Sequence, residues 1–134
     1  MSGLVLKLSP KERVLVNGAV IENGDRRSRL SIMTPNANIL RLRDAIHPEE
    51  ANTPVRRACY SLQLVLSGDA DADEVERSLL RHIEDLSQVF TDSDSRRQIG
   101  LATEAVIGGR HYQGLKALRS LLDREERLMA VARQ

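Results

Sequence analysis

Two arginines stand two residues apart in the run ILRLRDAI, which covers residues 39–46. The alternation of leucine and arginine in this run is typical of a β-strand, whose side chains repeat with a period of two. On such a strand Arg41 and Arg43 would leave the same face about 7 Å apart, because each residue advances a strand by ~3.3 Å. Two guanidinium groups held side by side suit water, a carboxylate of the same chain, or a phosphate backbone.

Further basic side chains accompany this pair. Residues 1–48 hold eight basic and four acidic side chains, a net charge of +4, whereas residues 49–134 hold 12 basic and 15 acidic side chains, a net charge of −3. Arginine outnumbers lysine 17 to 3, and its planar fork suits bidentate contacts with phosphate. The candidate anion-binding residues are Lys7, Arg26, Arg27, Arg29, Arg41, Arg43, Arg56 and Arg57. Pairing with Glu12, Glu22 and Asp44 is the alternative that the charge pattern leaves open.

Aromatic residues are scarce in this chain. The sequence contains Phe90, Tyr60 and Tyr112, and it contains no tryptophan. Stacking of bases on aromatic rings, as in four-stranded RNA-recognition sheets, therefore has little support. Any contact with a nucleic acid would depend on guanidinium groups and on the backbone.

The spacing of the reactive residues supports no catalytic or metal-binding motif. His47, His82 and His111 stand singly, and Cys59 is the only cysteine and is expected in the core. The acidic run at 69–74 lacks the glycine and glutamate that a calcium loop requires, and it suits a helix N-terminus instead. We therefore expect no enzymatic activity, no metal and no cofactor.

Residues 1–48, which we refer to as the β lobe, are expected to form about five short antiparallel strands. The runs GLVLKL, RVLV, AVIENGD, RRSRLSIM and ILRLR are alternating or β-branched. Asn17-Gly18 and Asn23-Gly24 each predict a tight turn, because both residue types tolerate the positive φ of a two-residue hairpin. The β lobe is basic and is the part of the chain expected to face a polyanion.

Residues 49–134, the helical lobe, follow a change in hydrophobic periodicity at Pro48. Thr53 and Pro54 are typical of the N-cap and first position of a helix, and Ser95 opens a sequence that resembles a capping box. The expected helices cover about 54–67, 71–90, 95–107 and 111–131. The predicted fold class is therefore α+β, with a strand-rich lobe followed by four helices.

The last expected helix carries a broad apolar stripe, whose members are Leu115, Leu118, Leu121, Leu122, Leu128 and Met129. The spacing of three and four residues is that of a packing seam, and we expect most of the stripe to cover neighbouring helices. The remainder, toward 121–131, is expected to dock a second subunit or a partner helix. The candidate partner-binding residues are Leu121, Leu122, Leu128 and Met129.

The chain shows no apolar run near the ~20 residues that a membrane span requires. Its N-terminus, MSGLVLKLSPKER, lacks the basic start and long apolar stretch of a signal peptide. We therefore expect a cytoplasmic protein without a membrane partner.

Three stretches resemble the flagellar-biosynthesis repressor family FlbT of alphaproteobacteria: LRLRDAI, EEANTPVRRACYSLQ and YQGLKALRSLLDREE. The resemblance covers nearly the whole chain, and ANTPVRR is its most specific part. It implies a post-transcriptional regulator that associates with the 5′ untranslated region of flagellin mRNA and lowers its translation or stability. It also implies a small companion protein, FlaF, and no enzymatic site. The family pattern carries lysine where this chain has Arg43, so the positive charge is kept.

Residues 4–46 are also similar, in their pattern of strand-like runs and turns, to the carbon-storage-regulator family of RNA-binding proteins. In that family five short strands interlock two chains, and an arginine on the last strand reads an RNA loop. The resemblance places Arg43 at that arginine and Glu12 at the acid after the first turn. Leu8 and Ser9 depart from the pattern, because that family has two basic residues there.

These observations predict an RNA-binding regulator whose β lobe contacts the flagellin mRNA leader. In this hypothesis Arg41 and Arg43 make the most specific contacts, and the helical lobe supports a homodimer or docks a companion. The alternative is an adaptor that binds flagellin or a companion regulator through its last helix without direct contact with RNA. The two hypotheses differ in salt response, because binding through phosphates weakens steeply as salt rises.

Overall fold

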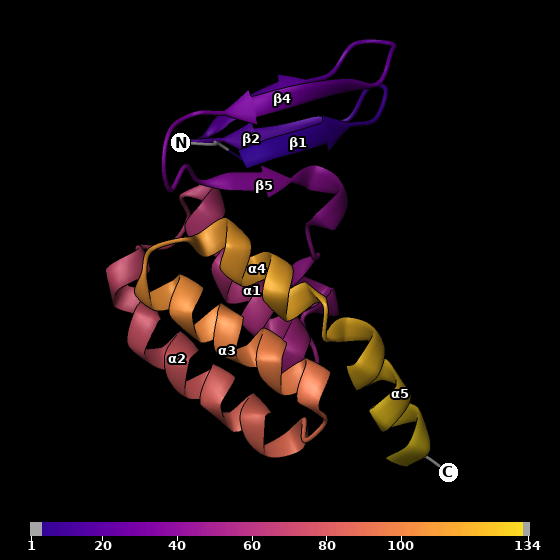
Figure 1. The fold of residues 1–134 in the computed structure, drawn as a ribbon, viewed down its shortest axis with the longest axis vertical. Coiled ribbons are helices and arrows are strands. Elements are labelled where there is room, and N and C mark those ends of the chain that lie inside the picture. The colour runs from indigo at the N-terminus through magenta and orange to yellow at the C-terminus, as the bar shows by residue number, and fades with distance from the viewer. Residues whose placement is uncertain (1–3, 133–134) are drawn as a thin grey trace.

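The computed structural model describes residues 4–132 and confirms the α+β class, with short strands preceding helices (Figure 1). The strands are β1 (Leu4–Leu8), β2 (Arg13–Val16), β3 (Ala19–Glu22), β4 (Ser28–Ile32) and β5 (Ile39–Arg41). Gly3, the first residue of the expected first strand, lies outside the described residues.

The strands form two small antiparallel sheets. One sheet pairs β1 with β4, and the other has the order β3-β2-β5. In the first sheet Leu6 lies opposite Leu30, and in the second Val14 lies opposite Arg41. Leu6 and Val14 are both buried, so each sheet turns an apolar face inward. β5 lies between the other strands and the helices, with α1 packed against it (Figure 1).

The two Asn-Gly pairs behave differently. Asn17 and Gly18 have φ values of 48° and 86° and join β2 to β3 in the predicted tight hairpin. At Asn23-Gly24 the prediction of a tight turn is wrong, because β3 and β4 belong to different sheets and neither residue has a positive φ. The Asn23 amide instead donates to the carbonyls of Ser9 and Arg26, which fastens a longer connection between the sheets.

Five helices follow within the described residues. Two 3₁₀ turns, η1 (Leu42–Asp44) and η2 (Pro48–Glu50), lead into α1 (Pro54–Ser67), α2 (Ala72–Val89), α3 (Ser93–Ile107), α4 (His111–Arg119) and α5 (Leu122–Ala132). α1 is central and packs against α2, α4, α5 and β5. Its start is as predicted: Thr53 is the N-cap, its hydroxyl accepts from the Arg56 N–H, and Pro54 is the first residue.

The starts of the next two helices are also set by acidic caps. Asp71 caps α2 by accepting from the Asp73 N–H, which confirms the interpretation of the acidic run as a helix start. The capping box predicted at Ser95 is wrong. α3 begins two residues earlier, because Asp92 is its N-cap and accepts from the Ser95 N–H at 3.0 Å.

The expectation of one continuous helix over 111–131 is also wrong. The segment divides into α4 and α5, and α5 takes a different direction from α4 (Figure 1). At the break the Leu121 N–H donates to the Leu118 carbonyl, and the Ser120 hydroxyl donates to the Ala117 carbonyl. The tighter i→i−3 bond ends the α-helix. Leu118 and Leu121 are both buried, so the apolar spacing continues across the turn and does not reveal it.

Both lobes contribute to one hydrophobic core. A single cluster of buried residues joins Leu6 and Leu40 of the β lobe to Leu62 and Phe90 of the helical lobe. Cys59 lies in this cluster as predicted, and burial raises the pKa of its thiol to about 12, so the thiol stays neutral and packs as a small apolar group.

A buried ion pair fastens the two sheets together. Glu12 precedes β2, and its carboxylate accepts from Arg41 Nε at 2.6 Å and from Arg41 Nη2 at 2.8 Å. Arg41 Nη2 also donates to the Lys7 carbonyl on β1, and Glu12 Oε1 accepts from the Ser9 N–H. Because β1 belongs to one sheet and β5 to the other, these bonds hold the sheets in a fixed relation.

The placement predicted for Arg41 and Arg43 is therefore wrong. β5 ends at Arg41, and Arg43 lies in the 3₁₀ turn η1, so the two side chains do not share a strand face. Arg41 is buried and engaged by Glu12, while Arg43 is 54% exposed. For Arg41 the structure realises the alternative in which an arginine pairs with a carboxylate of its own chain.

Replacing Arg41 should strongly destabilise the fold. We expect Arg41→Ala to lower the free energy of unfolding by ~3–5 kcal/mol, because Glu12 would remain buried without its cation. Urea denaturation followed by circular dichroism measures the change. The matched control is Arg13→Ala, which breaks the exposed pair with Glu22 and should cost ~0–1 kcal/mol. Equal losses for the two variants would contradict the structural role assigned to Arg41.

Candidate nucleic-acid interface

Four of the predicted basic residues meet around one groove of the β lobe. The groove has a volume of about 450 Å³ and is lined by Lys7, Leu8, Ser9, Arg27, Ser28, Arg29 and Arg43. Its four cations come from β1, from the segment that enters β4, from β4 itself and from η1. No acidic residue is among the lining residues, so the surface carries concentrated positive charge.

The register of β1 against β4 explains most of this convergence. Lys7 lies directly opposite Arg29, and directly opposed residues of an antiparallel pair share a face. The neighbouring pair, Leu6 and Leu30, points into the core, so Lys7 and Arg29 point outward. Opposed like charges weaken a strand pair, and this sheet has only two strands. An unfavourable pair of this kind points to a role in binding and not in stabilising the fold.

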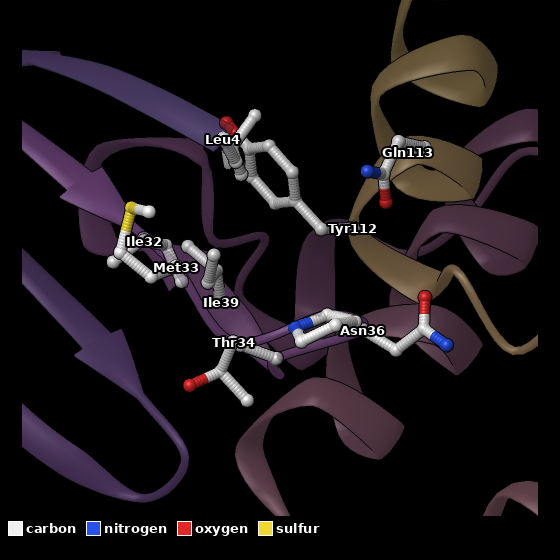
Figure 2. Close-up of a pocket in the computed structure, with 10 residues that line it drawn as sticks. Leu4, Ile32, Met33, Thr34, Asn36, Ile39, Tyr112 and Gln113 are labelled. Carbon is white, nitrogen blue, oxygen red and sulfur yellow. The ribbon is translucent and has the colours of Figure 1, made fainter. Parts of the chain in front are cut away.

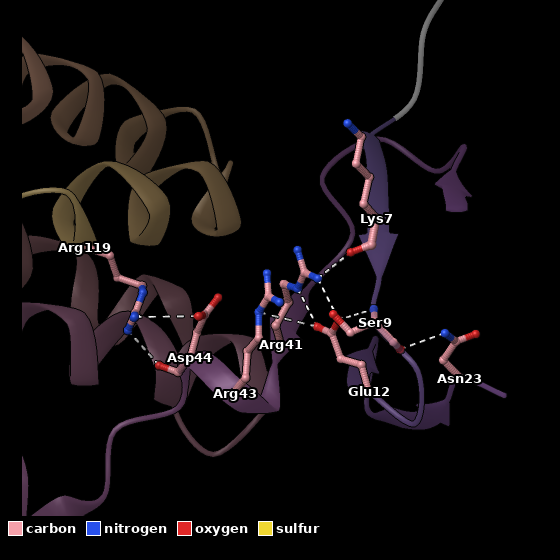
Figure 3. Close-up of polar contacts among 8 residues, drawn as sticks. All are labelled: Lys7, Ser9, Glu12, Asn23, Arg41, Arg43, Asp44 and Arg119. Carbon is pink, nitrogen blue, oxygen red and sulfur yellow. Dashed lines mark hydrogen bonds and ion pairs between the residues drawn. The ribbon is translucent and has the colours of Figure 1, made fainter. Parts of the chain in front are cut away.

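Arg43 approaches the groove from η1. Its Nε lies 3.7 Å from Glu12 Oε2, but that carboxylate already accepts three hydrogen bonds from Arg41 and Ser9 (Figure 3). The Arg43 side chain is more than half exposed, so most of its donors face solvent. Arg43 therefore keeps donors for a ligand, whereas the guanidinium of Arg41 is used within the fold.

The same bonds control the protonation of Glu12. The Arg41 hydrogen bonds are the largest influence, and they lower the pKa of Glu12 to about 2 against the opposing effect of burial. The Ser9 N–H and the positive charges of Arg41 and Arg43 contribute to the same lowering. Glu12 is thus ionised at neutral pH and neutralises Arg41. The net charge of the groove comes from Lys7, Arg27, Arg29 and Arg43.

The structure does not bring all the predicted basic residues together. Arg26 is exposed beside the groove lining but is not part of it, and Arg56 and Arg57 lie on α1. Arg56 is within hydrogen-bond distance of the Asn52 side chain at 3.3 Å. Ser9 and Ser28 add hydroxyl groups that sequence reasoning did not select as site residues. The sequence did single out this position: Leu8 and Ser9 stand where the carbon-storage-regulator family has two basic residues, and both line the groove.

A smaller hollow lies between β4, β5 and α4. It has a volume of about 200 Å³, and Figure 2 shows Tyr112 projecting from α4 toward Leu4. Its lining combines apolar side chains with the polar groups of Thr34 and Asn36, and none of its lining residues is charged. It offers apolar packing and a few hydrogen bonds to a ligand, but no ion pair.

A third cavity is apolar and lies beside α5. It has a volume of about 350 Å³, and its lining residues are Pro54, Leu86, Val89, Phe90, Glu125, Leu128, Met129 and Ala132. We refer to it as the α5 groove. The Glu125 carboxylate is directed to the start of α1, where it accepts from the Thr53 hydroxyl and from the Val55 N–H at 2.8 Å. This clamp ties α5 to the N-terminus of α1.

The predicted partner-binding residues divide between the core and the α5 groove. Leu128 and Met129 line the groove, and Leu128 is 37% exposed. Leu122 is half-buried against the core cluster. The prediction for Leu121 is wrong, because its side chain is fully buried and cannot reach a partner.

Other reactive groups are dispersed in the described part of the chain. No three His, Cys, Asp or Glu side chains of residues 4–132 gather as metal ligands would. Burial lowers the pKa of His82 and of His111, which favours their neutral forms. Within the same residues, none of the helices combines the length and apolarity needed to cross a bilayer.

The fold and groove together define a small α+β protein with a cationic surface beside a two-stranded sheet. The chain belongs to the FlbT family: the family model described as "Flagellar protein FlbT" matches residues 4–129. This match covers both lobes and confirms the resemblance to the FlbT family that the sequence shows.

Named relatives agree with this assignment. A protein of Bradyrhizobium diazoefficiens, named probable flagellum biosynthesis repressor protein FlbT 1, is 35% identical over 93% of this chain and 84% of its own length. Probable flagellum biosynthesis repressors FlbT from Chelativorans sp. and Caulobacter sp. are 30% and 29% identical, over 96% and 92% of this chain and 88% and 93% of their own lengths. No solved structure matches the chain significantly.

The lowered pKa of Glu12 predicts how stability responds to acid. Its folded-state pKa lies below its unfolded-state value, so the pair stabilises the fold fully above about pH 4.5 and loses this effect as the pH falls toward 2. We expect the stability advantage of the wild type over Glu12→Gln to be constant between pH 5 and 7 and to shrink below that range. Urea denaturation at a series of pH values measures it. An advantage that stayed constant down to pH 3 would refute the assignment.

Proposed function

We propose that this protein is a post-transcriptional regulator of flagellum biogenesis that binds the 5′ untranslated region of flagellin mRNA. Family membership and the names of the relatives support a regulatory role in flagellum synthesis. Binding lowers translation or stability of the message, in the cytoplasm. The observation that carries the RNA contact is the convergence of Lys7, Arg27, Arg29 and Arg43 on one groove.

The chemistry of the groove favours phosphate and the polar edges of bases. Binding of several phosphates releases condensed counterions, which supplies affinity that does not depend on sequence. The forks of Arg27, Arg29 and Arg43 suit bidentate contacts, and the Ser9 and Ser28 hydroxyls add donors of shorter reach. The lining contains no aromatic ring, so the groove contacts RNA without stacking.

In this proposal the protein acts by binding the mRNA and not by catalysing a reaction on it. The groove lining contains two serines, but no histidine or carboxylate lines it to serve as a general base. Arginine and lysine side chains supply hydrogen-bond donors and no acceptor. Regulation therefore follows from masking the leader or from presenting it to another factor.

Removal of two facing cations should weaken RNA binding strongly. We expect Lys7→Ala/Arg29→Ala to lower affinity for a flagellin leader transcript by about a hundredfold or more, since each of the two charged contacts contributes ~1.5 kcal/mol or more. The slope of log affinity against log salt should become shallower by ~1.4 for two lost single-strand phosphate contacts. Gel shifts across a salt series measure both quantities.

The matched control for this experiment is Arg77→Ala/Arg81→Ala. It removes two positive charges from exposed positions on α2, away from the groove lining. The control should retain the wild-type salt slope and nearly the wild-type affinity. If both double variants weaken binding equally, then the effect belongs to net charge and the groove is not the RNA site.

The α5 groove favours a second candidate function, that of an adaptor for a protein partner. Its lining is almost wholly apolar, and Val89, one of the lining residues, is 60% exposed. An apolar groove with one helix as a wall is the geometry that receives an amphipathic helix. In this proposal flagellin, a FlaF-type companion or a second copy of the chain occupies the groove, and contact with RNA is indirect.

A charge placed in the α5 groove should weaken binding of a protein partner. We expect Val89→Asp to weaken binding of flagellin or companion by about tenfold or more, because the buried carboxylate would have no partner. The control is Ile107→Asp, which alters a side chain of similar exposure on α3 outside the groove. Calorimetric titration measures partner binding, and light scattering measures self-association. Unchanged partner binding and self-association in Val89→Asp would exclude the groove.

A further inference from the structure

A polar connection runs from the helical lobe to the rim of the cationic groove. Arg119, the last residue of α4, donates from Nη1 to the Asp44 carbonyl at 2.8 Å. Its Nη2 lies 3.6 Å from Asp44 Oδ1, so one guanidinium contacts both backbone and side chain of the same residue. Figure 3 shows this contact beside the cluster formed by Arg43, Glu12 and Arg41.

The residue that Arg119 holds is the neighbour of a groove residue. Asp44 follows Arg43 in η1, which is a single 3₁₀ turn closed by the Ala45 N–H bond to the Leu42 carbonyl. η1 has no buried residue and no side-chain cap to fix it. η1 packs against β2 without burying a side chain, so the polar contacts at its ends help to fix its position. At the C-terminal end of η1, Arg119 contacts Asp44 within the turn itself, and the Gln63 side chain bonds the N–H and carbonyl of Ile46 two residues further on.

The contact on the other side of η1 is weaker. Arg43 Nε is 3.7 Å from a Glu12 carboxylate that Arg41 already engages through two hydrogen bonds. The Arg43 side chain is 54% exposed, whereas those of Arg119 and Asp44 are 31% and 27% exposed. The more sheltered contact is therefore the one with Arg119, and shelter from solvent strengthens an ion pair.

We propose that Arg119 is a positioning residue for the cationic groove: it fixes η1 and thereby the guanidinium of Arg43 at the groove rim. The affinity of the β lobe for RNA then depends on a residue of the helical lobe that does not touch RNA. This inference rests on the proposed RNA-binding function and adds a residue to it. It also gives Asp44 a defined role, as the group through which Arg119 acts.

A double-mutant cycle between Arg119 and Arg43 tests the proposal. We expect Arg119→Ala to weaken binding of the flagellin leader transcript about threefold to tenfold, the range of coupling through neighbouring residues. In the Arg43→Ala background the same substitution should change affinity less than twofold, because the group that Arg119 positions is gone. Arg119→Lys should restore part of the affinity by contacting Asp44 through one ammonium.

Two further measurements separate positioning from a general loss of structure. The matched control is Arg124→Ala, which removes a 3.6 Å ion pair with Asp92 remote from the groove lining and should bind RNA like the wild type. Amide hydrogen exchange at Ala45 should speed up in Arg119→Ala, because its N–H closes η1. Circular dichroism establishes that each variant is folded at the temperature of the binding assay.

The outcomes are distinguishable. If the wild type does not bind the transcript, then the proposed function fails and this inference fails with it. If the wild type binds and Arg43→Ala weakens binding, but Arg119→Ala has no effect or has an equal effect in both backgrounds, only the positioning role is overturned. Unchanged exchange at Ala45 in Arg119→Ala likewise overturns it.

Discussion

The buried pair of Glu12 and Arg41 is the interaction on which both the fold and the groove depend. It links a turn after β1 to the end of β5, and it reaches the β1 backbone through the Lys7 carbonyl. A sheet of two strands, such as β1-β4, is marginally stable at best by itself, so it depends on this link to the three-stranded sheet. The pair also separates two arginines that the sequence presents as equivalent. Arg41 is neutralised inside the protein, which leaves Arg43 at the surface beside Lys7 and Arg29.

Local signals in the sequence predicted much of the architecture. Period-two runs marked the strands, and the Asn17-Gly18 hairpin and the Thr53-Pro54 helix start follow from the chemistry of adjacent residues. These features depend on contacts within a few positions, so a single sequence contains the information. The class of the fold and the basic character of the β lobe were predictable for the same reason. The resemblance carried by ANTPVRR supplied the family, which the match over residues 4–129 confirms.

The features that sequence reasoning missed depend on contacts between distant residues. β5 ends at Arg41, and the guanidinium of Arg41 pairs with Glu12, which lies 29 positions earlier. The break before α5 keeps the leucine spacing intact, so periodicity cannot locate it. The groove itself follows from the pairing of β1 with β4, two strands that are not consecutive. Its cations were identified as candidates, but which of them meet is decided by strand register and by the turn at η1.

The shared core has a consequence for how such a protein can evolve. Leu6 and Leu40 of the β lobe pack in one cluster with Leu62 of α1, so each lobe supplies part of the interior of the other. A gene fragment that encoded residues 1–48 alone would leave this apolar surface uncovered. The two lobes are therefore not interchangeable modules, and recombination with unrelated proteins would have to transfer the chain as a unit. Inheritance of both lobes together would give one family match that spans both, and the match does run without division from residue 4 to residue 129.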